Sequence, residues 1–194
     1  MYVLVVTAVV QLMYVRTSAR FDGTLTPERN GSSVVRAVIA KIDASEVFND
    51  STWWQSTSER PLVKIFLRRM AYVETEDGNR NSVGGIWDIT EEIFRMTQTY
   101  VARSQSIRQN LMNSPILKID WHNIVYTDMT VPMYSGLAVA LYLDKLILDE
   151  GRQILPTNLY QLYRLWNYFG EGASGNTRSW EEGVRDLENN ERTY

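Results

Sequence analysis

The sequence predicts a mostly helical protein that folds as a single domain around one central buried helix. Apolar residues recur at steps of three and four in several segments, which is the period of an amphipathic helix. Prolines and capping residues stand where those segments start, as they do at the beginnings of helices. The chain has 194 residues, 44% of them hydrophobic and 22% charged, and no cysteine. A chain of this size can bury a sufficient core by packing alone.

The N-terminus has the pattern of a signal peptide. Residues 3–15, "VLVVTAVVQLMYV", form an apolar run that is short for a membrane span, and small residues follow up to Ala19. We therefore expect removal of residues 1–19, a mature domain over residues 20–194, and secretion to the extracellular space. The alternative is that the run forms a buried N-terminal strand or helix. No later apolar run is long enough to span a bilayer, so we expect no membrane contact after cleavage.

The individual helices follow from apolar spacing and from the residues that start or end them. A proline suits the first turn of a helix over residues 61–74, and Gly78 can end that helix. Thr90 can cap the next helix, whose first turn holds two glutamates at the positive end of the dipole. Residues 132–148 are apolar almost all round, which marks them as the buried centre of the fold. We expect further helices over residues 32–42, after Pro156 and after the capping box at 179–182.

Charge and composition argue against several partners and cofactors. The formal net charge is −3, and no basic stripe is interleaved with aromatic residues, which argues against nucleic acid as a partner. The absence of cysteine and the presence of a single histidine, His122, argue against a zinc site. We interpret His122, which follows Trp121, as a structural side chain, and we expect neither a metal nor a cofactor.

One stretch places a carboxylate at the edge of the predicted core. In "MAYVETEDGNRNSVGGIWDI", residues 70–89, Glu74 stands at the C-terminal end of a core helix. The negative end of the helix dipole and an apolar face both raise the pKa of a carboxyl there. A carboxyl that stays protonated near neutral pH can serve as a general acid. The alternative is a charged residue that simply reaches into water at a helix end.

The segment after Glu74 has the composition of a cleft edge. A polar loop over residues 77–83 precedes Gly84 and Gly85. Glycine lets the backbone approach a ligand or the preceding helix closely. We therefore expect the loop to form the lip of a substrate cleft beside Glu74.

Several motifs in this order resemble the lysozyme superfamily, in particular goose-type lysozymes and soluble lytic transglycosylases. The similarity is closest to a group of secreted animal proteins with a lysozyme-like domain. Three motifs carry it: "LRRMAYVETEDG" (67–78), "GGIWDITEE" (84–92) and "VPMYSGLAVALYL" (131–143). "AVIAKIDASEVF" (37–48) and the Asp-Trp of "KIDWHNIVYTDM" (118–129) fit the same group, and the resemblance covers residues 34–188.

The resemblance implies a lysozyme-like fold with a substrate cleft, and cleavage of peptidoglycan between N-acetylmuramic acid and N-acetylglucosamine. Glu74 would protonate the oxygen of the β-1,4 bond, and either a water or the sugar's own 6-hydroxyl would attack. Asp88 stands where the family has glutamine and is the candidate second carboxylate. The resemblance implies the following cleft residues, with Trp87 stacking on a sugar: Gly84, Gly85, Ile86, Trp87, Tyr134 and Tyr168.

Three departures from the family pattern support a second interpretation. Besides Asp88, Thr90 stands where goose-type enzymes have an aspartate, and Gly170 where the family has an asparagine, although nearby Asn167 blurs that alignment. The chain is then a catalytically inactive secreted protein that binds amino-sugar glycans or a protein partner. A third interpretation is a helical extracellular protein whose tryptophans all belong to the core, because aromatic residues at helical spacing usually serve packing. The sequence does not define an oligomeric state.

Overall fold

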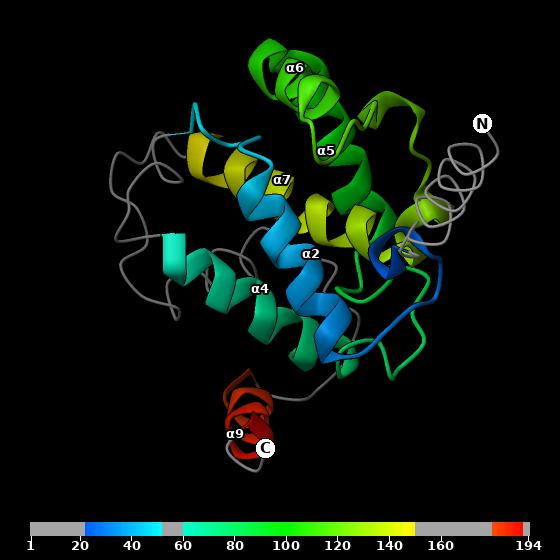
Figure 1. The fold of residues 1–194 in the computed structure, drawn as a ribbon, viewed down its shortest axis with the longest axis vertical. Coiled ribbons are helices and arrows are strands. Elements are labelled where there is room, and N and C mark those ends of the chain that lie inside the picture. The colour runs from blue at the N-terminus through cyan, green and yellow to red at the C-terminus, as the bar shows by residue number, and fades with distance from the viewer. Residues whose placement is uncertain (1–21, 52–59, 150–179, 192–194) are drawn as a thin grey trace, which may run out of the picture.

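The computed structural model describes residues 22–51, 60–149 and 180–191, and these residues confirm the mostly helical class (Figure 1). This part of the chain holds six α-helices and three short 3-10 helices, and no strand. The α-helices are α2 (Ser32–Ala44), α4 (Arg60–Thr75), α5 (Glu91–Arg103), α6 (Gln105–Asn113), α7 (Pro132–Asp149) and α9 (Trp180–Glu191). The 3-10 helices are η1 (Gly23–Leu25), η2 (Trp121–Asn123) and η3 (Tyr126–Thr130).

Helix α7 is the central helix of the described core, as its continuous apolar sequence predicts. Nearly all of its side chains from Pro132 to Ile147 are buried, because other elements cover it on several sides. Helices α5 and α2 make the largest of these contacts, and η3, η1 and α4 add to them. Figure 1 shows α2 crossing in front of α7.

Helix α4 ends where the backbone adopts a left-handed conformation. Three successive residues after Thr75 have positive φ, namely Glu76 at 53°, Asp77 at 62° and Gly78 at 87°. A left-handed backbone cannot continue a right-handed helix, so the chain leaves α4 at this point. The expected end near Gly78 is therefore confirmed, although two non-glycine residues precede the glycine in the turn.

The apolar spacing predicts an inner face of α4 formed by Leu62, Ile65, Phe66, Arg69, Met70 and Val73. Three of these side chains are buried, and Leu62 and Arg69 are half-buried. Phe66, Met70 and Val73 are buried, but Ile65 is 41% exposed. Leu67 and Ala71, which the expected face omits, are fully buried because α4 is covered on more than one side. Helix α2 packs on α4, and α9 packs on it as well.

Helices α5 and α6 meet at one serine. Thr90 caps α5 as expected, since its Oγ1 accepts a hydrogen bond from the Ile93 amide at 3.2 Å. Ser104 ends α5 and also caps α6, where its Oγ accepts from the Ile107 amide at 3.4 Å. The sequence interpretation missed α6, although a capping serine followed by Ile107 and Leu111 at a four-residue step is a usable signal.

Three of the predicted features lie outside the described residues: the signal peptide 1–19, the helix after Pro156, and Ser179 of the capping box. Helix α9, which that box would start, is described from residue 180. Within the described residues, no helix combines the length and the apolar character needed to cross a membrane.

Candidate active site

Glu74 lies in the last turn of α4 and is half-buried. The residue after it ties the helix end to the returning chain, because the Thr75 hydroxyl donates a hydrogen bond to the Ile86 carbonyl. The Gly78 amide in turn donates to the Thr75 hydroxyl at 2.8 Å. These contacts fix the chain just after Glu74, so the end of α4 is tied to the returning chain.

A buried ion pair anchors the loop that follows Glu74. Arg68 donates to the Asp77 carboxylate, and the exposed fractions of the two side chains are only 13% and 8%. The Gly31 amide donates to the Asp77 carbonyl at 2.7 Å, which joins the start of α2 to the same loop. Removing one partner of a buried pair leaves an uncompensated charge, so this anchor resists opening.

Gly84 and Gly85 allow a close approach between parts of the chain itself. A Cβ on Gly84 would lie 2.3 Å from the amide nitrogen of Ile89, with which the Gly84 carbonyl forms a hydrogen bond at 3.0 Å. A Cβ on Gly85, whose φ is +73°, would lie 1.9 Å from the Met129 carbonyl oxygen. The backbone therefore makes a close approach at both glycines, but the neighbours are the returning loop and η3 rather than α4.

Asp88 follows this turn in a left-handed conformation, with φ of 49°. Its carboxylate accepts a hydrogen bond from the Ser82 hydroxyl, and that hydroxyl accepts one from the Gly84 amide at 3.0 Å. A side chain held by a local network in this way has little freedom to move. The turn thus presents the Asp88 charge in a fixed position relative to the end of α4.

The pKa of Glu74 is raised from 4.5 to about 7. Burial of the carboxyl is the larger cause, and the negative charge of Asp88 is the second. The raised pKa confirms the direction expected from the sequence. A carboxyl with this pKa is half protonated at neutral pH, so it can donate a proton to a leaving group.

Tyr126 is a further residue of the site that sequence analysis missed. Its hydroxyl donates to the Ile89 carbonyl at 3.1 Å, one residue after Asp88. Burial raises the pKa of Tyr126, and the charges of Asp88 and Glu91 raise it further. Its place in η3, more than thirty residues along the chain, carries no local sequence signal for this contact.

Trp87 requires a correction. Its side chain is fully buried, and its indole Nε1 donates to the Leu67 carbonyl at 2.8 Å. The ring lies against Gly136 of α7, where an added Cβ would come within 3.0 Å of it. The ring is therefore not available to stack on a sugar, and Trp87 serves as a core residue that fixes the turn before Asp88.

The other candidate residues fall in different places. Tyr134 is half-buried in the first turn of α7 and packs against the core. Thr90 is the cap of α5, so its hydroxyl is engaged with the helix start. Tyr168 and Gly170 lie outside the described residues.

A pocket of about 420 Å³ opens beside the loop, and we call it the side pocket. Three segments form it: residues 28–30, the loop residues 78–86 and η3. Gly85 and Ile86 line it, whereas Glu74 and Asp88 are not among its lining residues. The loop between Glu74 and Asp88 therefore lines the side pocket, but the two carboxyls lie outside it. The described residues hold no cluster of three metal-ligating side chains.

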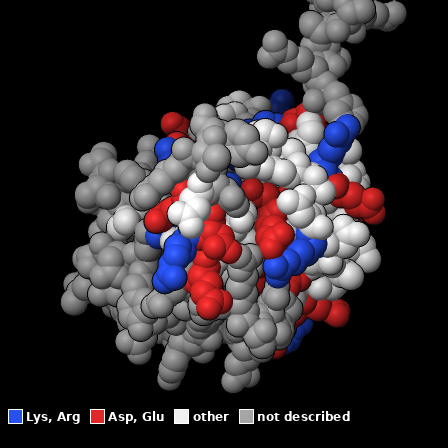
Figure 2. Space-filling view, turned by 90° about the horizontal axis from the view of Figure 1, so that it is seen from below, with Lys and Arg blue, Asp and Glu red and all other residues white. Residues whose placement is uncertain are grey.

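Acidic side chains gather on the described part of one face of the molecule. Figure 2 shows Asp and Glu in the middle of this face, with Lys and Arg among them. Ion pairs among the described residues include Arg80 with Glu76 at 2.6 Å and Arg69 with Glu188 at 2.8 Å. This mixed surface agrees with the formal net charge of −3.

Comparison with known proteins gives no match. No family model matches the chain, and neither the curated proteins nor the solved structures include one that does. The function must therefore be argued from the residues and their geometry.

Proposed function

We propose that this protein is a secreted glycosidase that cleaves the β-1,4 bond between N-acetylmuramic acid and N-acetylglucosamine in peptidoglycan. Glu74 is its general acid, and the domain has a lysozyme-like fold. The observation that carries the proposal is a half-buried carboxyl at the end of α4, whose pKa is about 7 next to a second carboxylate. The motifs around Glu74 and in α7 that resemble the lysozyme superfamily support the choice of substrate.

The two carboxyls suit the two roles of glycoside hydrolysis. Protonated Glu74 gives its proton to the glycosidic oxygen as the bond from that oxygen to the sugar C1 breaks, and positive charge develops on the sugar. Charged Asp88 removes a proton from a water molecule, whose oxygen then bonds to C1. If the sugar's own 6-hydroxyl attacks in place of water, the product is a 1,6-anhydro sugar. The side chain of Asp88, fixed by Ser82, supports the role of a positioned base.

The direct test is clearing of a purified bacterial cell-wall suspension, with mass spectrometry of the released fragments. We expect the wild-type protein to clear the suspension and Glu74→Gln to lose about a hundredfold or more of the rate, as is typical when a general acid is removed. Glu76→Gln is the matched control, because Glu76 lies two residues further on, at the surface, and pairs with Arg80. It should clear the wall at the wild-type rate.

The products and the variants separate the possible results. Reducing-end fragments indicate hydrolysis, and 1,6-anhydro fragments indicate transglycosylation. If Glu74→Gln clears the wall as fast as the wild type, Glu74 is not the acid. If the wild-type protein and both variants are folded and none clears the wall, the glycosidase proposal is wrong.

Thr90 favours a second candidate, a catalytically inactive glycan-binding protein on the same fold. Its hydroxyl occupies the position of the goose-type second carboxylate and is engaged as the cap of α5. Aspartate is also a good helix cap, so Thr90→Asp should leave the helix start intact. Under this candidate the wild-type protein does not clear the wall, and Asp88→Gln combined with Thr90→Asp gains activity.

A further inference from the structure

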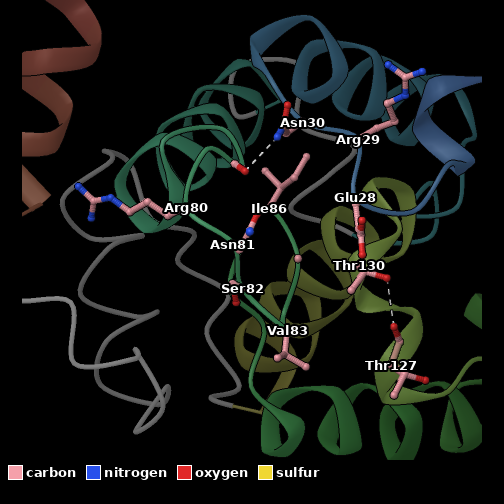
Figure 3. A pocket seen from close by; sticks show the side chains of 12 residues that line it. Glu28, Arg29, Asn30, Arg80, Asn81, Ser82, Val83, Ile86, Thr127 and Thr130 are labelled. Atoms are coloured by element: carbon pink, nitrogen blue, oxygen red, sulfur yellow. Dashed lines mark hydrogen bonds between the residues drawn. The ribbon is translucent and has the colours of Figure 1, made fainter.

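The side pocket has walls that hydrogen bonds fix in place. The Glu28 amide donates to the Thr130 carbonyl at 2.9 Å, which joins the N-terminal segment to η3. The Asn30 side-chain amide donates to the Gly78 carbonyl at 3.2 Å, which joins the same segment to the loop. Figure 3 shows this second bond at one wall and the bond from Thr130 to Thr127 at the opposite one. The pocket is therefore formed before any ligand arrives, which lowers the cost of binding.

Uncharged hydrogen-bonding side chains line two walls of the side pocket. Asn81 and Ser82 stand on the loop, and Thr127 and Thr130 stand on η3. Amides and hydroxyls both donate and accept hydrogen bonds, so they pair with ligand hydroxyls in either sense. Such a lining favours a ligand that carries many hydroxyl groups and no net charge.

The charged lining residues do not form an ion-binding cluster. Figure 3 shows the guanidinium groups of Arg29 and Arg80 extending outward, away from the other labelled side chains. Arg80 pairs with Glu76 at 2.6 Å. The carboxylate of Glu28 can accept hydrogen bonds from hydroxyl groups and argues against an anionic ligand.

Two apolar side chains complete the lining. Ile86 is buried at 3% exposure, and Val83 is 63% exposed on the loop. An apolar patch among uncharged polar groups matches a sugar, whose ring has an apolar face and whose acetamido group ends in a methyl. The volume of about 420 Å³ lies within the usual range of roughly 300–1,000 Å³ for small-molecule sites.

Ser82 connects the side pocket to the carboxyl pair. Its side chain lines the pocket, and its hydroxyl donates to the Asp88 carboxylate. A ligand in the pocket thus lies next to a residue that holds the proposed base. The loop between Glu74 and Asp88 carries both the reacting groups and one wall of the pocket.

We propose that the side pocket binds an uncharged amino-sugar unit of a glycan, through Asn81 and Ser82 on one wall and Thr127 on the other. The choice of an amino sugar rests on the proposed function, because the unit belongs to the glycan that Glu74 cleaves. The pocket is a binding site separate from the two carboxyls, and it holds a part of the chain beyond the reacting bond.

The test is a nuclear magnetic resonance titration of the full-length Glu74→Gln protein with the β-1,4-linked tetramer of N-acetylglucosamine. We expect the backbone amide signals of Gly78, Val83 and Gly85 to move. Asn81→Ala with Thr127→Val, added to this protein, should weaken binding about tenfold or more, the size expected from two lost hydrogen bonds. Asn113→Ala with Thr99→Val is the matched control, because both residues are exposed and lie on other helices. It should bind as tightly as the parent.

Two results overturn this inference: pocket signals that do not move at millimolar tetramer, or equal affinity in the pocket variant and the control. The wall-clearing assay is read separately. Clearing by wild type together with equal affinities leaves the glycosidase proposal standing and removes only the pocket. If the pocket variant binds the tetramer more weakly than the control and the wild-type protein does not clear the wall, the side pocket is supported and the glycosidase proposal is wrong.

Discussion

At the scale of single residues, the environment of Glu74 lowers the free energy of unfolding when the carboxyl is charged, and this loss can be measured. Its pKa of about 7 in the folded protein stands above the ordinary value of 4.5, so the folded state holds the proton more tightly than the unfolded state. The native state therefore loses stability as the pH rises from 4.5 to 7, by about 3 kcal/mol in total. Below pH 4.5 both states are protonated and the cost disappears.

Glu74→Gln should consequently stabilise the protein at high pH. Glutamine stays uncharged, so we expect a free energy of unfolding at pH 8 up to about 3 kcal/mol above that of the wild type. The gain should vanish at pH 4. Urea denaturation at the two pH values measures it, with Glu76→Gln, two residues further along the chain, as the control. Equal stability of wild type and Glu74→Gln at pH 8 would contradict the raised pKa.

Asp88 should contribute a smaller share of the same effect. Asparagine tolerates the left-handed φ of 49° and keeps an acceptor for Ser82, so Asp88→Asn removes the charge and retains the turn. In this background the gain from Glu74→Gln at pH 8 should shrink by about 0.5–1 kcal/mol. A double-mutant cycle of unfolding free energies measures the coupling. Asp120→Asn, which removes a carboxylate that does not act on Glu74, should leave the gain unchanged.

At the scale of elements, the double-glycine turn depends on the absence of a side chain. Gly85→Ala would place a Cβ 1.9 Å from the Met129 carbonyl oxygen, at a φ of +73° that alanine rarely adopts. We expect the free energy of unfolding to fall by about 3 kcal/mol or more, as for other clashes and strained positions. Gly23→Ala is the matched control, because nothing lies within 4 Å of its added Cβ. Chemical denaturation measures the free energy of unfolding of both variants. Similar values would contradict the prediction and show that the turn relaxes without a cost.

The sequence predicts the helices well because their causes are local. The apolar period, the cap at Thr90 and the turn at Gly78 all act within a few residues, and the structure confirms them. Helix α6 was missed, since nine residues with only Ile107 and Leu111 buried give a weak period. The exposed Ile65 shows the same limit, because its surroundings depend on how the other elements pack.

The candidate site was predictable only in part. Glu74 and Asp88 come from one continuous stretch, so their closeness follows from the turn between them. Tyr126 comes from η3, and no local pattern indicates that its hydroxyl reaches the Ile89 carbonyl. The motif also suggests an exposed Trp87, whereas packing against α7 turns the ring into the core. Contacts between distant segments decide these roles, and they need the folded chain.

At the scale of the whole molecule, one buried polar contact joins α5 to the central helix. Asp144 is fully buried in α7, and the Tyr100 hydroxyl of α5 donates to its carboxylate. Burial raises the pKa of Tyr100, and the charge and hydrogen bond of Asp144 raise it further, so the phenol keeps its proton. The hydrogen bond from Tyr100 to Asp144 therefore persists at neutral and moderately alkaline pH.

Tyr100→Phe should destabilise the core. Loss of the hydroxyl deprives a buried carboxylate of a donor, and we expect the free energy of unfolding to fall by about 2 kcal/mol. Tyr134→Phe is the control, because Tyr134 is half-buried in α7 and its hydroxyl forms no hydrogen bond with another of the described residues. Thermal and urea unfolding measure both variants. A Tyr100→Phe protein as stable as the control would mean that the Asp144 carboxylate does not need this donor.

The central claim is that the fold raises the pKa of Glu74 to about 7, and a carboxyl titration tests it most directly. The glutamate side-chain carboxyls are labelled with carbon-13, and their chemical shifts are followed by nuclear magnetic resonance from pH 3 to pH 10. The signal that is missing in Glu74→Gln is assigned to Glu74. The account predicts a midpoint near pH 7 for Glu74. A midpoint near 4.5, the ordinary value for a glutamate in water, would contradict it and leave Glu74 without the property that a general acid requires.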